Sequence, residues 1–307
     1  MFEGHKDLLG LKELSGEQIE TILETAVQMK HIMSQPNKKT GHLVGKSVVT
    51  LFYENSTRTR LSFELAAKYM SAFTSSVSAS GSSVSKGESL IDTARTIDVM
   101  GTDVIILRHG MSGAPHLIAK NVNACVINAG DGMNEHPTQA LLDMFTIKEK
   151  RGKIEGQKIA IIGDILHSRV ARSNIWGLTK LGAKVAVAAP STLLPAGLEQ
   201  TGIEIYTDID KAIDGADAVM GLRIQAERQS GGLFPSLAEY SRFFGINQTK
   251  LTLAKPDALL LHPGPVNRGV ELSPEAADSD VSVIDEQVTN GVAIRMAVLY
   301  LFTKKDV

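Results

Sequence analysis

The chain has 307 residues, of which 43% are hydrophobic and 21% charged, and its formal net charge is -2. This length exceeds the size at which one hydrophobic core usually keeps growing, so two domains are expected, and the composition excludes a disordered or collagen-like chain. The small net charge excludes a general attraction to nucleic acid or to anionic membranes. Any anion-binding site must therefore come from a local cluster of side chains.

Cysteine content and hydropathy limit the surroundings in which the protein works. Cys125 is the single cysteine, so the sequence excludes an internal disulfide and a zinc site built from cysteines, and it fits a reducing compartment. Residues 1–7 lack the apolar core of a signal peptide, and no stretch of about 18 uncharged apolar residues occurs. We expect a cytoplasmic protein that binds neither a membrane nor nucleic acid.

The first half of the chain alternates predicted helices and strands. A helix is expected after Ser15, because Ser15 and Gln18 have the spacing of a capping box and apolar residues follow at helical intervals. Short apolar runs predict buried strands at residues 48–52, 104–107 and 125–127. Helical patterns occur at residues 61–69 and 140–147. This alternation predicts a parallel sheet.

A polar segment with two glycines, residues 149–157, is expected to connect two domains. We therefore place the first domain at residues 1–150 and the second at 151–290, with a C-terminal helix at about 291–307 returning to the first. The second domain has a predicted helix from Arg169 to Leu181 and predicted strands at residues 159–162, 185–187, 218–220 and 259–261. The predicted fold class is α/β, with two parallel-sheet α/β domains and helices on both faces.

The segment Ser56-Thr57-Arg58-Thr59-Arg60 follows a predicted strand and opens a predicted helix. Backbone N–H groups at a helix N-terminus, together with hydroxyl and guanidinium groups, favour a phosphate site. The alternative is that Ser56 or Thr57 simply caps the helix. An arginine in the first turn faces the positive end of the helix dipole, which costs about 0.3–1 kcal/mol unless an anion is bound. We therefore favour an anion site.

Two further strand ends carry side chains that suit the same chemistry. His136 precedes a proline at the expected start of a helix, where the dipole favours a neutral imidazole that can donate to a carbonyl oxygen. Gln139 lies in the same turn, and a cap and a solvated side chain remain the alternatives for these two residues. Arg108 follows its strand at the carboxyl end, where ligands bind in open parallel sheets. The convergence of Arg58, Arg108 and His136 on one edge favours a shared site.

The first strand of the second domain is followed by Gly163, at the position where a dinucleotide-binding fold begins its glycine fingerprint. The second and third glycines are missing, which argues against a nicotinamide dehydrogenase. The chain has neither a His-Glu-x-x-His motif nor a Gly-x-Ser-x-Gly motif. The sequence therefore gives no support for metal-dependent or covalent catalysis, and we expect no metal and no cofactor.

Arginines near other strand ends of the second domain suit an acidic substrate. Arg169, Arg223 and Gln225 have the chemistry to bind two carboxylates, although solvated arginines remain the alternative. The sequence His-Pro-Gly-Pro ends the last predicted strand, and it allows a cis bond before Pro265. Residues 82–88 are polar, and by composition alone they read as a surface linker.

Two motifs in the first domain and two in the second resemble those of the aspartate and ornithine carbamoyltransferases, and the resemblance covers essentially the whole chain. Ser-Thr-Arg-Thr-Arg from residue 56 and His-Pro-Thr-Gln from residue 136 are shared by both branches of that family. The ornithine enzymes carry Ser-Met-Gly and His-Cys-Leu-Pro in the second domain. This chain instead has Arg-Ile-Gln at residues 223–225 and His-Pro-Gly-Pro at residues 262–265, which is similar to the aspartate branch.

The resemblance implies transfer of the carbamoyl group of carbamoyl phosphate to L-aspartate, an early step of de novo pyrimidine (UMP) biosynthesis, without a cofactor. It implies carbamoyl phosphate binding by Ser56, Thr57, Arg58, Thr59, Arg108, His136, Gln139, Gly264 and Pro265. Of these residues, the ones implied in catalysis are Arg58, Thr59, Arg108 and His136. The residues implied in aspartate binding are Lys86, Arg169, Arg223 and Gln225.

The resemblance also implies partners. In this family Ser82 and Lys86 come from a neighbouring subunit, which implies a homotrimer with shared active sites and overturns the reading of their loop as a linker. Regulatory chains or other enzymes of pyrimidine synthesis are candidate partners. The rival hypotheses are carbamoyl transfer to ornithine, a chain that only binds anions or partners, and a nicotinamide oxidoreductase.

Overall fold

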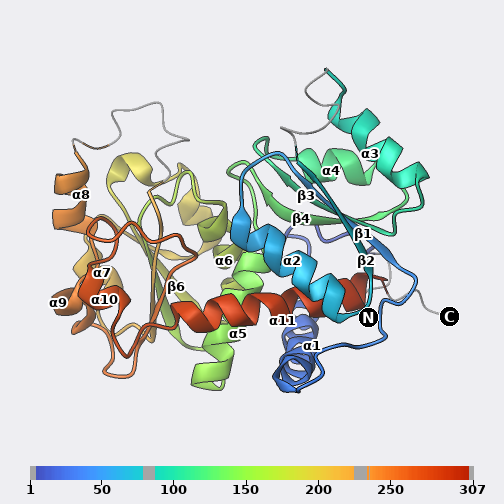
Figure 1. The fold of residues 1–307 in the computed structure, drawn as a ribbon. Coiled ribbons are helices and arrows are strands. Elements are labelled where there is room, and N and C mark those ends of the chain that lie inside the picture. The colour runs from blue at the N-terminus through green and yellow to red at the C-terminus, as the bar shows by residue number, and fades with distance from the viewer. Residues whose placement is uncertain (1–4, 79–86, 225–233, 235, 304–307) are drawn as a thin grey trace. The chain divides into compact units, whose positions relative to one another are not determined.

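The structure is a computed structural model that describes residues 5–78, 87–224, 234 and 236–303. Contacts divide the chain into two compact units. Unit 1 comprises Met1–Leu142 and Thr289–Val307, and unit 2 comprises Asp143–Val288. Each unit contains one sheet whose paired strands are all parallel, and helices cover the sheets (Figure 1). The predicted fold class, two parallel-sheet α/β domains, is confirmed.

The sheet of unit 1 has the strand order β2-β1-β3-β4. Its strands are β1 (Ser47–Phe52), β2 (Phe73–Ser78), β3 (Val104–His109) and β4 (Cys125–Asp131). The three predicted strands are present, and β3 and β4 continue past their apolar runs into polar residues. Strand β2 was not predicted, because it is an edge strand with a polar, largely exposed sequence that lacks an apolar run.

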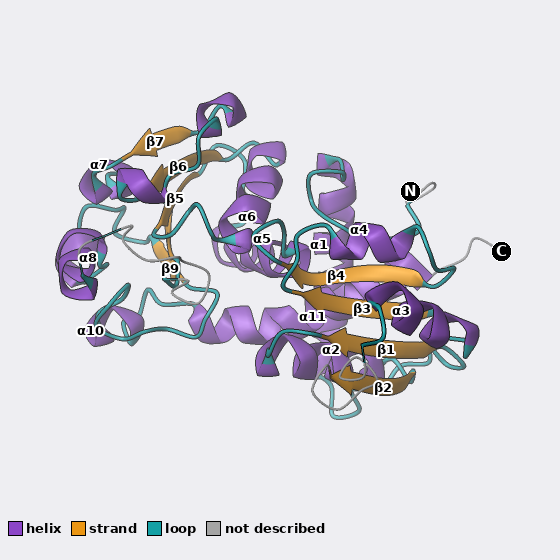
Figure 2. Cartoon of the chain, turned by 90° about the horizontal axis from the view of Figure 1, so that it is seen from above, coloured by secondary structure: helices purple, strands orange, loops and turns teal. Residues whose placement is uncertain are grey.

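Helices pack on both faces of this sheet. One face packs against α3 (Leu90–Val99) and α4 (Ala114–Ala119), through a buried cluster that includes Ala94, Ile97 and Ile118. The opposite face is covered by α1 (Gly16–Ser34), α2 (Thr57–Tyr69) and the C-terminal helix α11 (Ile284–Thr303), as Figures 1 and 2 show. The capping box predicted at Ser15 and Gln18 is present at the start of α1.

The C-terminal helix returns to unit 1, as predicted. Residues from Thr289 onward belong to that unit. The guanidinium carbon of Arg295 lies 5.1 Å from the centre of the Phe63 ring of α2, and the rings of Tyr300 and His42 meet edge to face at 5.0 Å. These contacts join the end of the chain to segments near its beginning.

The sheet of unit 2 has the order β7-β6-β5-β8-β9. Its strands are β5 (Lys158–Ile162), β6 (Lys184–Ala188), β7 (Glu204–Tyr206), β8 (Ala218–Gly221) and β9 (Leu259–Leu261). The helices are α5 (Pro137–Arg151), which begins in unit 1, α6 (Arg169–Lys180), α7 (Ile209–Ile213), α8 (Leu237–Phe244), α9 (Gln248–Leu251) and α10 (Pro274–Ala277), with 3-10 turns at Ser191–Leu193 and Leu198–Thr201. The three-residue edge strand β7 was not predicted.

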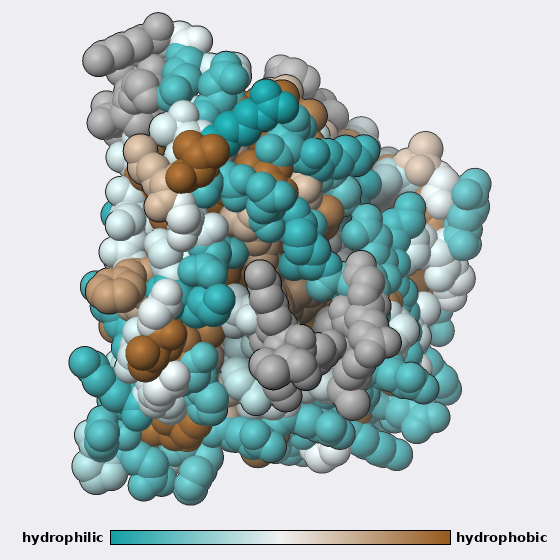
Figure 3. Space-filling view, turned by 90° about the vertical axis from the view of Figure 1, so that its right-hand side faces the viewer, coloured by the Kyte–Doolittle hydropathy of each residue, from teal (hydrophilic) through white to brown (hydrophobic). Residues whose placement is uncertain are grey.

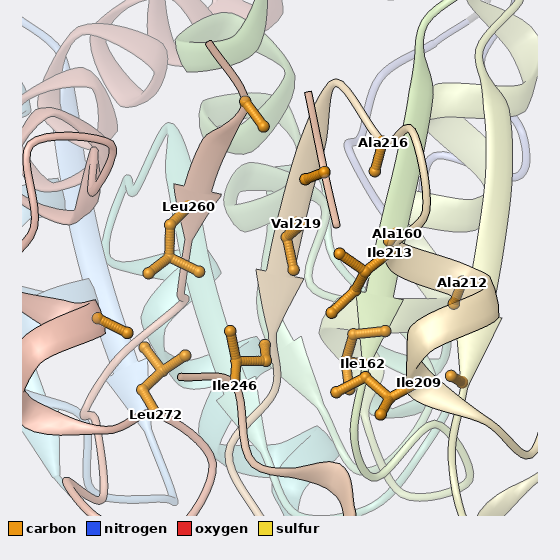
Figure 4. Packing of buried hydrophobic residues seen from close by; sticks show 14 of the residues in the cluster. Ala160, Ile162, Ile209, Ala212, Ile213, Ala216, Val219, Ile246, Leu260 and Leu272 are labelled. Atoms are coloured by element: carbon orange, nitrogen blue, oxygen red, sulfur yellow. The ribbon is translucent and has the colours of Figure 1, made fainter. Parts of the chain in front are cut away.

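The core of unit 2 combines small and branched side chains (Figure 4). Ala160 and Ala212 lie on facing elements, the strand β5 and the helix α7, and Ile162, Ile209 and Ile213 fill the space beside them. Alanine lets the helix approach the sheet closely, and each isoleucine removed from water contributes about 1.5–3 kcal/mol. This packing fixes the strands whose carboxyl ends carry the polar residues described below.

Both sheets have a point at which the direction of winding reverses. In unit 1 the chain adds β2 on one side of β1 and then β3 on the other side, and in unit 2 it adds β6 and β7 on one side of β5 and then β8 and β9 on the other. The reversal lies between β1 and β3 in unit 1 and between β5 and β8 in unit 2. In open α/β sheets, ligands bind outside the carboxyl ends of the strands at this point.

On the face of the molecule drawn in Figure 3, the described residues are mainly hydrophilic, with separate apolar positions. Figure 3 shows brown hydrophobic patches set among teal hydrophilic side chains on one face of the molecule. Exposed apolar residues of this kind are usual on globular proteins. Within the described part of the chain, no helix has the length and apolar character needed to cross a membrane.

Candidate functional site

The helix that begins after β1 does not use its first serine as a cap. Ser56 is the N-cap residue of α2, yet its side chain makes no capping hydrogen bond. The first turn contains no acidic residue and carries Arg58 and Arg60. Capping by Ser56, the simpler alternative, is therefore not seen. The Ser56 hydroxyl lies at the positive end of the helix, where the dipole favours an anion.

The side chains of this segment differ in exposure. Thr57 and Arg58 are exposed, whereas Thr59 is only 7% exposed. Consecutive residues of a helix point in directions about 100° apart, which explains the change from one residue to the next. The segment thus presents hydroxyl and guanidinium groups at the carboxyl end of β1.

Arg108 lies at the carboxyl end of β3 and is held from both neighbouring strands. Its Nη1 donates to the carbonyl oxygen of Ala129 at 3.2 Å, and its Nε lies 3.5 Å from Oε2 of Glu54. The backbone N–H of Tyr53 donates to the carbonyl oxygen of Arg108 at 2.9 Å. The guanidinium is therefore not the solvated surface group that was the alternative for Arg108, since its side chain is only 14% exposed.

His136 and Gln139 lie at the start of α5, which begins at Pro137 as predicted. Both side chains are buried. The backbone N–H of Gln139 donates to the carbonyl oxygen of His136 at 3.0 Å, which is the first hydrogen bond of the helix. A solvated Gln139, one of the alternatives, is therefore ruled out. The imidazole lies at a helix N-terminus, whose dipole favours its neutral form.

Another histidine of this region, His109, lies in surroundings that favour the neutral form of its imidazole. Burial lowers the pKa of His109 although the carboxylates of Glu54 and Asp131 raise it. Nδ1 of His109 accepts a hydrogen bond from the backbone N–H of Met111 at 2.9 Å, so the proton of the neutral ring is on Nε2. At neutral pH the positive charge at the end of β3 therefore comes from Arg108.

The reversal point of unit 2 is built around a tight glycine. Gly163 follows β5 with φ +132, and a Cβ at this position would lie 3.0 Å from both Cβ and the carbonyl oxygen of Leu222. Its neighbour Asp164 is fully buried and accepts from the backbone N–H of His167 at 3.1 Å and from Nδ1 of His167 at 2.8 Å. These bonds shape the turn that leads to Arg169, which opens α6 and is 4% exposed.

The loop after β9 is held by its first residue. Nδ1 of His262 accepts from the backbone N–H of Gly264 at 2.8 Å, and Nε2 of His262 lies 3.3 Å from Oε1 of the buried Glu271. The bond between Gly264 and Pro265 is cis, as the sequence allowed. Arg223 follows β8 and is partly buried.

The predicted site residues therefore form two groups. Unit 1 brings the segment 56–59, Arg108, His136 and Gln139 to strand ends or helix starts of one sheet edge, and unit 2 does the same with Arg169, Arg223 and the loop at 262–265. Three predicted residues, Ser82, Lys86 and Gln225, lie outside the described residues.

Several carboxylates that organise these edges were not predicted as site residues. Glu54, Asp131 and Asp164 each end or follow a strand, and Glu271 supports the loop after β9. A signal was present, because an acidic residue directly after a buried strand lies at the same edge as the basic ones. The position in the sequence did not predict which backbone N–H group donates a hydrogen bond to each carboxylate.

Two parallel sheets, each with cationic and imidazole groups near the carboxyl ends of its strands, define an α/β protein whose sheet edges are suited to small anionic ligands. Residues 6–149 match the domain described as "Aspartate/ornithine carbamoyltransferase, carbamoyl-P binding domain", and residues 155–302 match the "Asp/Orn binding domain" of the same proteins. The chain belongs to the aspartate/ornithine carbamoyltransferase family.

Relatives are similar over nearly the whole chain. The aspartate carbamoyltransferase catalytic subunit of Acetivibrio thermocellus is 68% identical over 98% of this chain and 96% of its own length, and that of Ruminiclostridium cellulolyticum is 67% identical over the same shares. Among solved structures, aspartate transcarbamoylase of Trypanosoma cruzi with carbamoyl aspartate and phosphate has a TM-score of 0.86 at 28% identity, covering 96% of this chain and 95% of that one. Ornithine carbamoyltransferase of Pyrococcus furiosus has a TM-score of 0.84 at 32% identity, covering 95% of each chain.

Proposed function

We propose that this protein is an aspartate carbamoyltransferase, which transfers the carbamoyl group of carbamoyl phosphate to the amino group of L-aspartate. The products are N-carbamoyl-L-aspartate and phosphate. This reaction is an early step of pyrimidine synthesis. The observation that carries this proposal is the full-length similarity, at 67% and 68% identity, to chains named aspartate carbamoyltransferase catalytic subunit. The Arg-Ile-Gln sequence at residues 223–225 supports the choice of aspartate over ornithine, because guanidinium groups bind carboxylates bidentately.

Residues 1–150 with the C-terminal helix at 291–307 bind carbamoyl phosphate in this proposal. The uncapped start of α2 supports a phosphate site at the Ser56 and Thr57 hydroxyls, with Arg58 and Thr59 completing it. Arg108 bridges the phosphate and the carbamoyl carbonyl. Gln139 orients the carbamoyl amino group together with the backbone of Gly264 and Pro265.

The reaction needs no nucleophile from the protein, because carbamoyl phosphate is already activated. The unprotonated amine of aspartate attacks the carbonyl carbon, and the tetrahedral oxyanion is stabilised by Thr59, Arg108 and His136. The carbon–oxygen bond to phosphate then breaks, and the departing phosphate takes the proton of the amine. Positioning and electrostatic stabilisation thus supply most of the rate acceleration.

Residues 151–290 bind aspartate in the same proposal. Arg169 and Arg223 hold its carboxylates with the help of Gln225 and of Lys86. The burial of Arg169 supports this role, because a buried guanidinium forms stronger charge-assisted hydrogen bonds than a solvated one.

The proposed assembly is a homotrimer in which Ser82 and Lys86 serve the site of a neighbouring subunit. Mixing two inactive variants, Arg58→Ala and Lys86→Ala, tests this directly. In a randomly mixed trimer, about one quarter of the shared sites combine an intact Arg58 with an intact Lys86. Recovery of activity on mixing is expected, whereas an inactive mixture would place both residues in the same subunit. Regulatory chains are a further proposed partner, supported by the relatives' name of catalytic subunit.

The substrate assignment is tested by assaying the purified chain with carbamoyl phosphate and either aspartate or ornithine. We expect carbamoyl aspartate as the main product. Faster turnover of ornithine would move the protein to the other branch of the family. A chain that makes neither product but binds phosphate would be an anion-binding protein without this activity.

A further inference from the structure

The loop before α5 is closed around a buried carboxylate. Asp131 ends β4 and is fully buried. Its Oδ1 accepts hydrogen bonds from Nδ2 of Asn128 at 2.8 Å and from the backbone N–H of Glu135 at 3.1 Å, and its Oδ2 accepts from the backbone N–H of Gly113 at 2.7 Å. Nδ2 of Asn134 lies 3.1 Å from Oδ2 and 3.3 Å from Oδ1. One side chain thus joins the end of β4, the loop before α5 and the loop after β3.

These bonds determine where His136 lies. The N–H group bound by Asp131 belongs to Glu135, the residue immediately before His136. The backbone N–H of Asp131 donates in turn to the carbonyl oxygen of Glu135 at 3.1 Å. Both the N–H and the carbonyl group of Glu135 are therefore hydrogen-bonded to Asp131. The carboxylate of Glu135 accepts from the N–H groups of Leu11 at 2.7 Å and Lys12 at 3.2 Å, which ties the loop to the N-terminal segment.

The same carboxylate fixes the end of β3 that carries Arg108. The pairing of β3 with β4 shifts register between Leu107 and His109, and His109 is opposite Asp131. Such a bulge turns side chains to a new direction, and here Nη1 of Arg108 meets the carbonyl oxygen of Ala129. The loop that continues from β3 is held by the bond from the Gly113 N–H to Asp131.

We propose that Asp131 is a positioning residue for carbamoyl transfer. By holding the loop before α5 and the loop after β3, it places His136 and Arg108 where they can stabilise the oxyanion. This inference rests on the function proposed above. Every group that binds Asp131 in these hydrogen bonds is an N–H donor, so both terminal atoms of the side chain at this position must be acceptors. Asparagine has the same shape but would present an NH2 group to one of those donors. A displacement of about 1 Å in reacting groups costs about 100-fold in rate.

The test compares Asp131→Asn with Asp98→Asn in the full chain. Asp98 also accepts hydrogen bonds from two backbone N–H groups, those of Asn123 at 3.0 Å and Ala124 at 2.8 Å. It lies on α3, however, and these bonds hold no segment of the site. We expect kcat of Asp131→Asn to fall about 10- to 100-fold and KM for carbamoyl phosphate to rise, with KM for aspartate within about twofold of wild type. Asp98→Asn should keep all three constants.

Each outcome decides the inference. A purely structural role would lower the thermal midpoint of Asp131→Asn and leave its kinetic constants unchanged below that temperature, and this result would overturn the proposal. If Asp131→Asn does not fold, Asn134→Ala removes a weaker donor to the same carboxylate, and the same split between the two KM values is required of it. A wild-type chain without carbamoyl aspartate production would instead refute the proposed function itself.

Discussion

The carboxylate of Glu54, which follows β1, lies 3.5 Å from Nε of Arg108, which is in the neighbouring strand β3. A phosphate that binds Arg108 must therefore share it with a negative charge. Replacing Glu54 with Gln should tighten the binding of inorganic phosphate by about fivefold, from the lost repulsion between charges about 7 Å apart. Titration calorimetry at low and high salt measures the change, which salt should reduce. Asp103→Asn, at the amino end of β3, is the matched control and should have no effect.

Arg108 itself is expected to be essential for turnover. Replacement by Ala should cost at least about 3 kcal/mol of transition-state stabilisation, or more than 100-fold in kcat, because an oxyanion donor is lost. Arg108→Lys should recover little of this activity, since an ammonium group cannot reproduce the planar fork. Steady-state assays of carbamoyl aspartate production decide the matter. Turnover close to wild type in Arg108→Ala would remove the residue from the mechanism.

Ser15 and Ser56 both precede a helix, but we expect Ser15 to cap its helix and Ser56 to bind phosphate. Ser15 accepts from the backbone N–H of Gln18 at 3.2 Å in a capping box, whereas Ser56 makes no capping bond. Ser15→Ala should lower the free energy of unfolding by about 1 kcal/mol and leave phosphate affinity unchanged. Ser56→Ala should leave stability within about 0.5 kcal/mol and weaken phosphate binding about tenfold. Urea denaturation and phosphate titration together test this pair, and an equal loss of stability in both variants would contradict it.

Gly163 is expected to tolerate no side chain. A Cβ there would approach Cβ and the carbonyl oxygen of Leu222 to 3.0 Å, in a conformation with φ +132. Gly163→Ala should destabilise the protein by about 2 kcal/mol or more, because strain and overpacking add. Gly215→Ala, with φ +64 and open space around its Cβ, isolates the cost of backbone conformation, about 1 kcal/mol. Thermal unfolding of both variants measures the difference. Equal losses would mean that the contact with Leu222 is unimportant.

Asp217 should make stability depend on pH. Burial raises its pKa, but hydrogen bonds from Lys255 and the N–H of Lys158, together with the charge of Arg151, outweigh burial and lower the pKa. A lowered pKa in the folded state contributes stability above the unfolded value of about 3.9, and this contribution is lost as the pH falls through the folded value. Asp217→Asn should therefore cost about 2 kcal/mol at pH 7.

The difference between Asp217→Asn and wild type should shrink as urea denaturation is repeated at decreasing pH below about 4. Asp278→Asn is the control, because the ion pair of Asp278 with Arg268 is exposed and contributes little. A difference for Asp217→Asn that stays constant from pH 7 to pH 3 would show that the carboxylate charge is not the cause.

The sequence by itself determined the features that depend on neighbouring residues. Apolar runs and helical intervals located β1, β3, β5 and most other strands, together with the helices α1, α2, α5, α6 and α11. The conflict between arginines and the helix dipole predicted an anion site at the segment 56–60. The motifs at residues 56 and 136 also identified the family that the comparisons confirm. These signals are local, because the spacing of side chains along a helix or strand is fixed by its own geometry.

The tertiary structure decided which distant groups meet. The edge strands β2 and β7 have no apolar run, and their pairing with β1 and β6 follows only from the assembled sheet. The contact of Glu54 with Arg108, and the bond from the Gly113 N–H to Asp131, join residues that are 18 or more positions apart in the chain. Such contacts depend on the path of the whole chain. A carboxylate can accept a hydrogen bond from any N–H group, and the fold determines which N–H groups lie close to it.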